Sequence, residues 1–140
     1  MAEYEFDLDP KSPPEVIAAR NALADEVCRE LTRSGLPVYR ADLENDREKR
    51  PGAAVHVDPL VDGGVFVNWR TETELRDSTL ELFAKGIDYT NPPSVVLHHK
   101  TINDCMRVAV LAILTSAGFT AEEPDGHTRG SMLHVTGRRH

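Results

Sequence analysis

The side chains best suited to chemistry lie on two neighbouring segments that read as paired strands. Alternation places His56 and Asp58 on the polar side of the first segment, and Asn68 and Arg70 on the polar side of the second. These residues offer an imidazole, a carboxylate, an amide and a guanidinium, which suit hydrogen bonding to a small polar ligand or to a partner protein. We therefore take this polar face as the first candidate site.

The hydrophobic pattern of the two segments predicts a hairpin and its register. Residues 53–60 and 65–70 flank Asp62-Gly63-Gly64, a sequence typical of hairpin loops. A loop of these three residues puts every apolar partner on one face. The apolar pairs are then Val61 with Val65, Pro59 with Val67, and Val57 with Trp69. The pairs on the other face are His56 with Arg70, Asp58 with Asn68, and Leu60 with Phe66.

Two interpretations of this polar face stay open. In one, Leu60 and Phe66 lie exposed beside the polar residues, because helices cover only the opposite face of a small sheet, and the face binds a partner. In the other, the face is solvated and carries a diagonal ion pair between Asp58 and Arg70, which contributes under about 1 kcal/mol. The binding hypothesis involves six residues: His56, Asp58, Leu60, Phe66, Asn68 and Arg70.

A metal site would need ligands from distant segments. The chain has six histidines but contains neither HExxH nor CxxC. His98 and His99 are neighbours on an expected strand, so their side chains should point to opposite faces. His56 and Asp58 could share a metal only if the fold supplied a third ligand such as His134. The sequence therefore predicts no metal and no other cofactor.

Cys105 is the second candidate for catalysis. It is expected at the end of the first turn of a helix, where the helix dipole favours a thiolate. A histidine that follows it, His127 or His134, would complete the order found in many cysteine hydrolases. Cys105 also belongs to an apolar stripe, which predicts instead a buried core thiol. Motifs that bind phosphate, GxxxxGK[ST] and GxGxxG, do not occur.

Three segments carry the start and stop signals of helices. Each begins with a serine or threonine followed three residues later by an acidic residue, and each ends at a glycine followed by an apolar residue. The expected helices run from Ser12 to Gly35, from Thr71 to Gly86, and from Thr101 to Gly118. The third is apolar around most of its circumference, so we expect it to be central and the most buried.

The remaining elements read as strands. Residues 94–98 (SVVLH) form a continuous apolar run that predicts a strand buried on both faces and leading into the third helix. Residues 119–122 and 132–136 flank a turn signal at residues 124–126 and predict a second hairpin. Residues 38–40 suggest a short edge strand. The result is a strand–helix–strand connection after the first hairpin.

These elements predict one α+β domain over residues 1–140. We expect flexible ends at residues 1–11 and 137–140. Four to five strands form a small, mainly antiparallel sheet, with three helices packed mostly on one face. The element order is similar to that of small α+β folds in bacterial secretion-chaperone and immunity-type proteins, at the level of fold alone.

Composition narrows the classes of partner and location. The chain has a formal net charge of −7, which disfavours binding to nucleic acids and to anionic membranes. Its N-terminus lacks the basic and apolar regions of a secretory signal, and its longest apolar stretch is too short to cross a bilayer. Two cysteines in apolar settings fit a reducing compartment. We expect a cytoplasmic protein.

The leading hypothesis is a small non-enzymatic module that binds a protein, most simply a second copy in a homodimer, through the exposed sheet face. The alternative is a small hydrolase or metal-dependent enzyme that uses His56, Asp58 and Arg70, or Cys105. The first hypothesis takes precedence because the chain lacks a compact catalytic constellation, whereas Leu60 and Phe66 are apolar at positions where a solvated face would not require them.

Overall fold

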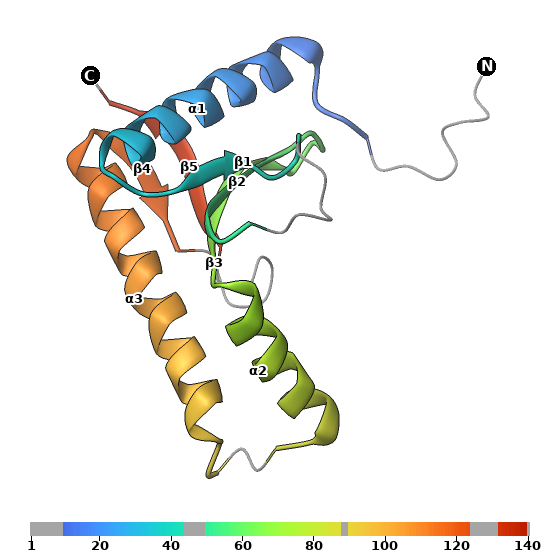
Figure 1. Cartoon of the computed structure of the whole chain (residues 1–140). Coiled ribbons are helices and arrows are strands. Elements are labelled where there is room, and N and C mark those ends of the chain that lie inside the picture. Colours follow the sequence, from blue (N-terminus) through green and yellow to red (C-terminus); the bar gives the residue numbers. More distant parts are fainter. Residues whose placement is uncertain (1–9, 44–49, 88–89, 124–131, 140) are drawn as a thin grey trace.

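The computed structural model describes residues 10–43, 50–87, 90–123 and 132–139 (Figure 1). Within these ranges it contains three helices, α1 (Pro14–Arg33), α2 (Thr73–Lys85) and α3 (Ser94–Ser116). The strands are β1 (Val38–Arg40), β2 (Gly52–Asp58), β3 (Gly64–Arg70), β4 (Phe119–Glu122) and β5 (Leu133–Arg138). The predicted α+β class is confirmed. None of the described helices combines the length and hydrophobicity needed to span a bilayer.

The strands form one sheet in the order β1-β2-β3-β5-β4. β1 runs parallel to β2 and the other neighbouring pairs are antiparallel, so the sheet is mainly antiparallel as predicted. The short edge strand at residues 38–40 is present. β4 and β5 form the predicted second hairpin, whose register shifts between Thr120 and Ala121. Its expected turn at residues 124–126 lies outside the described residues.

Helices α1 and α3 cover one face of the sheet (Figure 1). The core between these helices and the sheet is built from inward-facing strand residues and one side of each helix. Its buried members are Ala24, Val27, Leu31, Ala53, Val55, Val65, Val67, Val110, Leu114, Phe119, Leu133 and Val135. α2 differs from the expected arrangement of three helices on the sheet, because it packs along the N-terminal part of α3, beyond the end of the sheet (Figure 1).

The predicted helix ends are confirmed, but the predicted starts are not. Each helix stops just before a glycine with positive φ: Gly35, Gly86 and Gly118. α1 begins after Pro13, and the Ser12 hydroxyl donates to the carbonyl oxygen of Leu60 instead of capping the helix. α2 is capped by Glu72, whose carboxylate accepts from the backbone N–H of Leu75.

The largest correction concerns residues 94–98, which form the beginning of α3 and not a strand. Pro93 precedes the helix, and Val96 continues the buried side that includes Val110 and Leu114. A short apolar run does not distinguish a buried strand from a buried helical turn, and here the 3.6-residue period extends across Thr101. The expected strand–helix–strand connection is therefore wrong.

α3 is also less buried than its composition suggested. Leu97 is 49% exposed and Val108 is 56% exposed, and both lie on the side away from Val96 and Val110. The sheet and the other helices cover only part of the circumference of α3. The prediction of a central helix buried on all sides is therefore wrong.

The described parts of the expected flexible ends are bonded to the body of the protein. Lys11 forms a β-bridge with Leu60, and the Pro10 carbonyl accepts from the N–H of Val61. At the other end β5 continues to Arg138, and the N–H of Arg139 donates to the carbonyl of Gly118. Residues 1–9 and 140 lie outside the described residues.

Candidate functional site

The first hairpin has the predicted faces but a different register. Val57 pairs with Val65 and Ala53 with Trp69, so the connecting loop spans residues 59–63 instead of 62–64. Each cross-strand partner is displaced by four residues from its predicted position. The polar face now pairs His56 with Phe66, Ala54 with Asn68, Asp58 with Gly64, and Gly52 with Arg70. A displacement by an even number keeps every side chain on its predicted face.

The loop itself explains this register. The Asp58 carboxylate accepts from the N–H of Leu60 at 3.0 Å, and the N–H of Gly63 donates to the carbonyl of Leu60 at 2.8 Å. A Cβ at position 63 would lie 2.4 Å from the backbone oxygen of Asp58, so only glycine fits there. Asp58 is therefore a turn-forming residue.

Contacts from α1 hold the loop from outside the hairpin. Arg20 Nη1 donates to the carbonyl oxygen of Asp58 at 2.7 Å and to that of Leu60 at 2.8 Å. Together with the bridge between Lys11 and Leu60, these bonds satisfy the backbone carbonyls of Asp58 and Leu60. With the predicted three-residue loop, these two residues would instead have paired with the second strand. These bonds join residues that are far apart in the sequence, so local sequence patterns do not reveal them. Arg20 was therefore not among the predicted site residues.

The six predicted site residues do not form one cluster. His56 Nε2 lies 2.7 Å from Asn68 Oδ1, so these two side chains are brought together. Asp58 and Arg70 pair with glycines at opposite ends of the hairpin, six residues apart along β2. At about 3.3 Å per residue that separation is close to 20 Å. The predicted diagonal ion pair between them is therefore wrong.

Phe66 is buried, with only 4% of its surface exposed. His134 from β5 lies beside it in the sheet, and the two rings stack with their centroids 4.7 Å apart. A Cβ at Gly64 would lie 2.6 Å from His134 Nε2, which shows how closely the imidazole approaches the β3 backbone. The expectation that Phe66 is an exposed contact residue is wrong.

The β1 end of the same face is also occupied. The Arg70 guanidinium lies 5.7 Å from the ring centroid of Tyr39, and that of Arg50 lies 4.7 Å from it. The Tyr39 hydroxyl donates to the backbone oxygen of Arg50 at 2.7 Å, and Tyr39 packs with Ala54 in a small second core. Arg70 thus contributes to packing around an aromatic ring.

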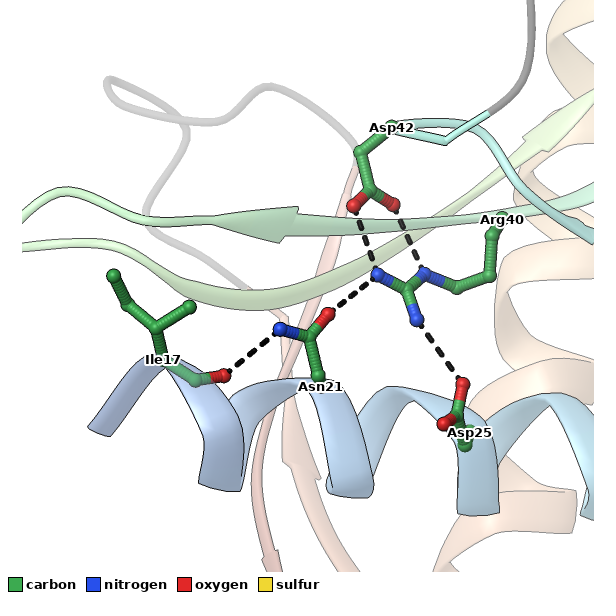
Figure 2. A network of polar contacts seen from close by, with 5 residues as sticks. All are labelled: Ile17, Asn21, Asp25, Arg40 and Asp42. Atoms are coloured by element: carbon green, nitrogen blue, oxygen red, sulfur yellow. Dashed lines mark hydrogen bonds and ion pairs between the residues drawn. The ribbon is translucent and has the colours of Figure 1, made fainter. Parts of the chain in front are cut away.

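A guanidinium that the sequence analysis did not select has the most complete polar environment. The side chain of Arg40 on β1 is 11% exposed and contacts Asp42, Asn21 and Asp25 (Figure 2). Burial raises the pKa of Asp42, but the hydrogen bonds and charge of Arg40 outweigh it, so that pKa lies below its usual range. The contacts tie an edge strand to α1, which is a structural role.

Within the described residues, neither predicted enzymatic site is assembled. Among the residues that the structure describes, no group of three or more histidine, cysteine, aspartate or glutamate side chains could hold a metal. Cys105 lies in the middle of α3 and not in its first turn, and it is exposed, which corrects its expected burial. Cys28 is half-buried, and burial raises its pKa to about 11. His127 lies outside the described residues.

Comparisons with models of protein families, with curated proteins and with solved structures found no match. A candidate site must therefore be identified from the exposed residues of this chain alone. The hairpin formed by α2 and α3 carries three exposed large apolar side chains, Leu80, Leu97 and Val108. Leu97 and Val108 lie on one side of α3, and exposed apolar residues that share a helix face are typical of interaction sites.

A groove of about 300 Å³ lies between α2 and α3. His99 lies in it, 3.0 Å from the Thr71 hydroxyl through Nε2 and 3.3 Å from the Asn103 amide nitrogen through Nδ1. Burial, with a smaller contribution from the charge of Arg76, lowers the pKa of His99. These contacts connect the start of α2 to α3 and give the hairpin a defined geometry.

Proposed function

We propose that the protein is a small non-enzymatic interaction module that binds a protein partner through the exposed apolar side chains of the α2–α3 hairpin. The observation that carries the proposal is the exposure of Leu80 on α2 and of Leu97 and Val108 on α3. Because each of these side chains is about half exposed, covering one contributes roughly 1 kcal/mol. A hairpin that extends beyond the sheet can reach a partner without displacing the core (Figure 1).

The proposal moves the contact surface away from the polar face of the sheet. Phe66, which was the apolar centre of that face, is buried against His134. Leu60 is half-buried and bridged to Lys11. The six residues therefore offer no exposed large apolar side chain, whereas α2 and α3 offer Leu80, Leu97 and Val108.

An enzymatic function has weaker support. His56 contacts Asn68, while the Asp58 side chain accepts from the Leu60 N–H and Arg70 lies at the far end of the hairpin. Cys105 is exposed, but its mid-helix position gives the thiol no assistance from the helix N-terminus. In the proposal the protein works in the cytoplasm with both cysteines reduced, which agrees with their unpaired state.

The test compares two charge-introducing variants with a matched control. Leu97→Glu and Val108→Glu place a carboxylate on the exposed side of α3, and Val61→Glu does so at a 59% exposed valine in the loop of the first hairpin. Native mass spectrometry of purified protein should show a stoichiometric protein complex, of one chain type or two, for the wild type and Val61→Glu. Both α3 variants should lose it while thermal unfolding remains unchanged.

Two outcomes would overturn the proposal. The first is a wild-type protein that is free of any protein partner and monomeric at high concentration. The second is a complex that survives Leu97→Glu and Val108→Glu, since the partner would then bind elsewhere.

A further inference from the structure

Helix α2 is attached to the rest of the protein mainly through α3. Among the described elements, α3 is the only one with which α2 makes extensive contacts. Of the described side chains of α2, Thr79 is the only buried one, and its hydroxyl donates to the carbonyl of Leu75 in the same helix. A helix without a fully buried apolar side chain gains little from packing, so α2 belongs to the part of the fold that opens most easily.

His99 lies at the contact between the two helices and uses both nitrogens of its ring. Asn103 Nδ2 donates to His99 Nδ1 at 3.3 Å, which leaves the proton of the neutral ring on Nε2. Nε2 then donates to the hydroxyl of Thr71 at 3.0 Å, just before α2 begins. Thr71 is buried, so this bond is shielded from water. The neutral imidazole therefore holds the start of α2 to α3.

The Asn103 amide is only partly satisfied in this arrangement. Its Oδ1 is buried and has no hydrogen-bond partner among the described residues. Asn103 also lines a small cavity whose other walls include Trp69, Val110 and Arg107. A buried acceptor without a donor destabilises the arrangement that contains it. A second orientation of the amide, in which Oδ1 receives a donor, would remove this cost.

Protonation of His99 supplies that donor. A proton from solvent adds to Nδ1, which can then no longer accept from the Asn103 amide. Rotation of the amide by about 180° places Oδ1 against the new Nδ1–H, so one hydrogen bond is exchanged for another. We propose that His99 and Asn103 form a proton-operated switch, in which this exchange puts a positive charge between α2 and α3 and releases α2.

The charges around His99 favour release. The positive charge of Arg76 on α2 acts on His99, so an imidazolium creates repulsion across the contact between the helices. On α3, Lys100 and Arg107 line the same groove as His99, and Asp104 is bonded to both, at 2.6 and 3.2 Å. No carboxylate of the described residues pairs with His99 itself. The sheet residues beside the switch are uncharged.

The pKa of His99 gives the direction of the switch. With α2 bound, burial and the charge of Arg76 lower this pKa, whereas with α2 released the ring meets water and should have a pKa of about 6.5. At neutral pH the ring is uncharged in both forms and α2 stays bound. In acid the released form takes up the proton first, and each pH unit between the two pKa values favours release about tenfold. The switch acts within one chain and requires no partner.

Three signals follow the switch in the wild-type protein between pH 7 and pH 5. In NMR spectra the side-chain amide of Asn103 should titrate with the same midpoint as the His99 ring. Trp69 is the only tryptophan of the chain and lines the same cavity as Asn103, so its fluorescence should change with that midpoint. Hydrogen exchange should show the protection of the α2 amides falling about threefold or more, while α1 keeps its protection.

Four variants test the roles of the residues. His99→Gln can form hydrogen bonds but cannot titrate, so it should abolish all three changes, whereas the exposed neighbour in His98→Gln should leave them as in the wild type. Asn103→Asp offers Nδ1–H a carboxylate without any rotation, and should raise the midpoint of His99 by about one pH unit or more. Arg76→Gln removes the repulsion and should reduce the loss of α2 protection in acid.

Two results would overturn the proposal. If His99 titrates while the Asn103 amide does not, the proton is taken up without the exchange of hydrogen bonds. If α2 keeps its protection at a pH where His99 is charged, or loses it equally in His99→Gln, the charge does not release the helix. The wild-type and Arg76→Gln measurements decide the question even if Asn103→Asp does not fold.

Discussion

Arg40 and Asp42 form a two-pronged ion pair, with Nε 3.0 Å from Oδ1 and Nη2 2.8 Å from Oδ2 (Figure 2). The same guanidinium donates to Asn21 at 2.8 Å and to Asp25 at 3.1 Å, both on α1. β1 contains only three residues and lies at the edge of the sheet. The side chain of one of its residues therefore joins this strand to the helix that covers the sheet.

Replacing Arg40 with alanine should lower the free energy of unfolding by about 1.5 kcal/mol, because it removes the charge-assisted hydrogen bonds to Asp42 and Asn21. Asp25→Asn is the control, since Asp25 is mostly exposed and its contact should contribute under about 1 kcal/mol. Urea denaturation measures both. Equal losses for the two variants would contradict the role of the ion pair with Asp42.

The pKa of His99 predicts a loss of stability in mild acid. Burial, and to a lesser extent Arg76, lowers this pKa in the folded protein, whereas the histidine of the unfolded chain should have a pKa of about 6.5. Above that pH the histidine is neutral in both states, so its titration does not change the free energy of unfolding. As the pH falls below it, the unfolded state binds the proton first, and stability decreases until the folded pKa is reached.

The corresponding experiment compares His99→Gln with the wild type between pH 7 and pH 5. The variant should lose less unfolding free energy than the wild type over this interval. His98→Gln, at the exposed neighbouring position, should follow the wild-type curve. Parallel curves for wild type and His99→Gln would show that this imidazole does not contribute to acid sensitivity.

Gly52 begins β2 under a steric constraint. Its φ is +123°, and a Cβ there would lie 2.6 Å from the backbone oxygen of Pro37. Gly52→Ala should lower the free energy of unfolding by about 2 kcal/mol or more, since both the backbone conformation and the space exclude a side chain. A Cβ at Gly137 would have no atom within 4 Å, so Gly137→Ala should change the free energy of unfolding by less than about 0.5 kcal/mol. Thermal unfolding measures the two variants side by side.

The two cysteines should differ strongly in reactivity. Cys105 is exposed, whereas Cys28 is half-buried with a pKa raised to about 11, so little of it is thiolate at neutral pH. Titration of folded protein with a chromogenic disulfide should show one fast thiol, which Cys105→Ser removes. Fast reaction of two thiols would indicate that the region around Cys28 opens readily.

Part of the candidate site could be predicted from the sequence. Alternation correctly placed Val57 and Trp69 on one face of the hairpin and His56 and Asn68 on the other. It did not supply the register, because a displacement of four residues preserves both faces. Arg20, which bonds to two loop carbonyls, is distant in sequence and gives no local signal.

The sequence by itself determined the class of fold, the C-terminal ends of the helices and the facing of the residues in the first hairpin. These follow from glycine conformations and from periodic burial, which are local properties. Only the tertiary structure decided that residues 94–98 are helical, that Phe66 is buried against His134, and that one side of α3 is exposed. Each of these depends on which distant segment packs against a residue. An apolar side chain can be recognised in the sequence as one that can be buried, but the sequence does not show which segment will cover it.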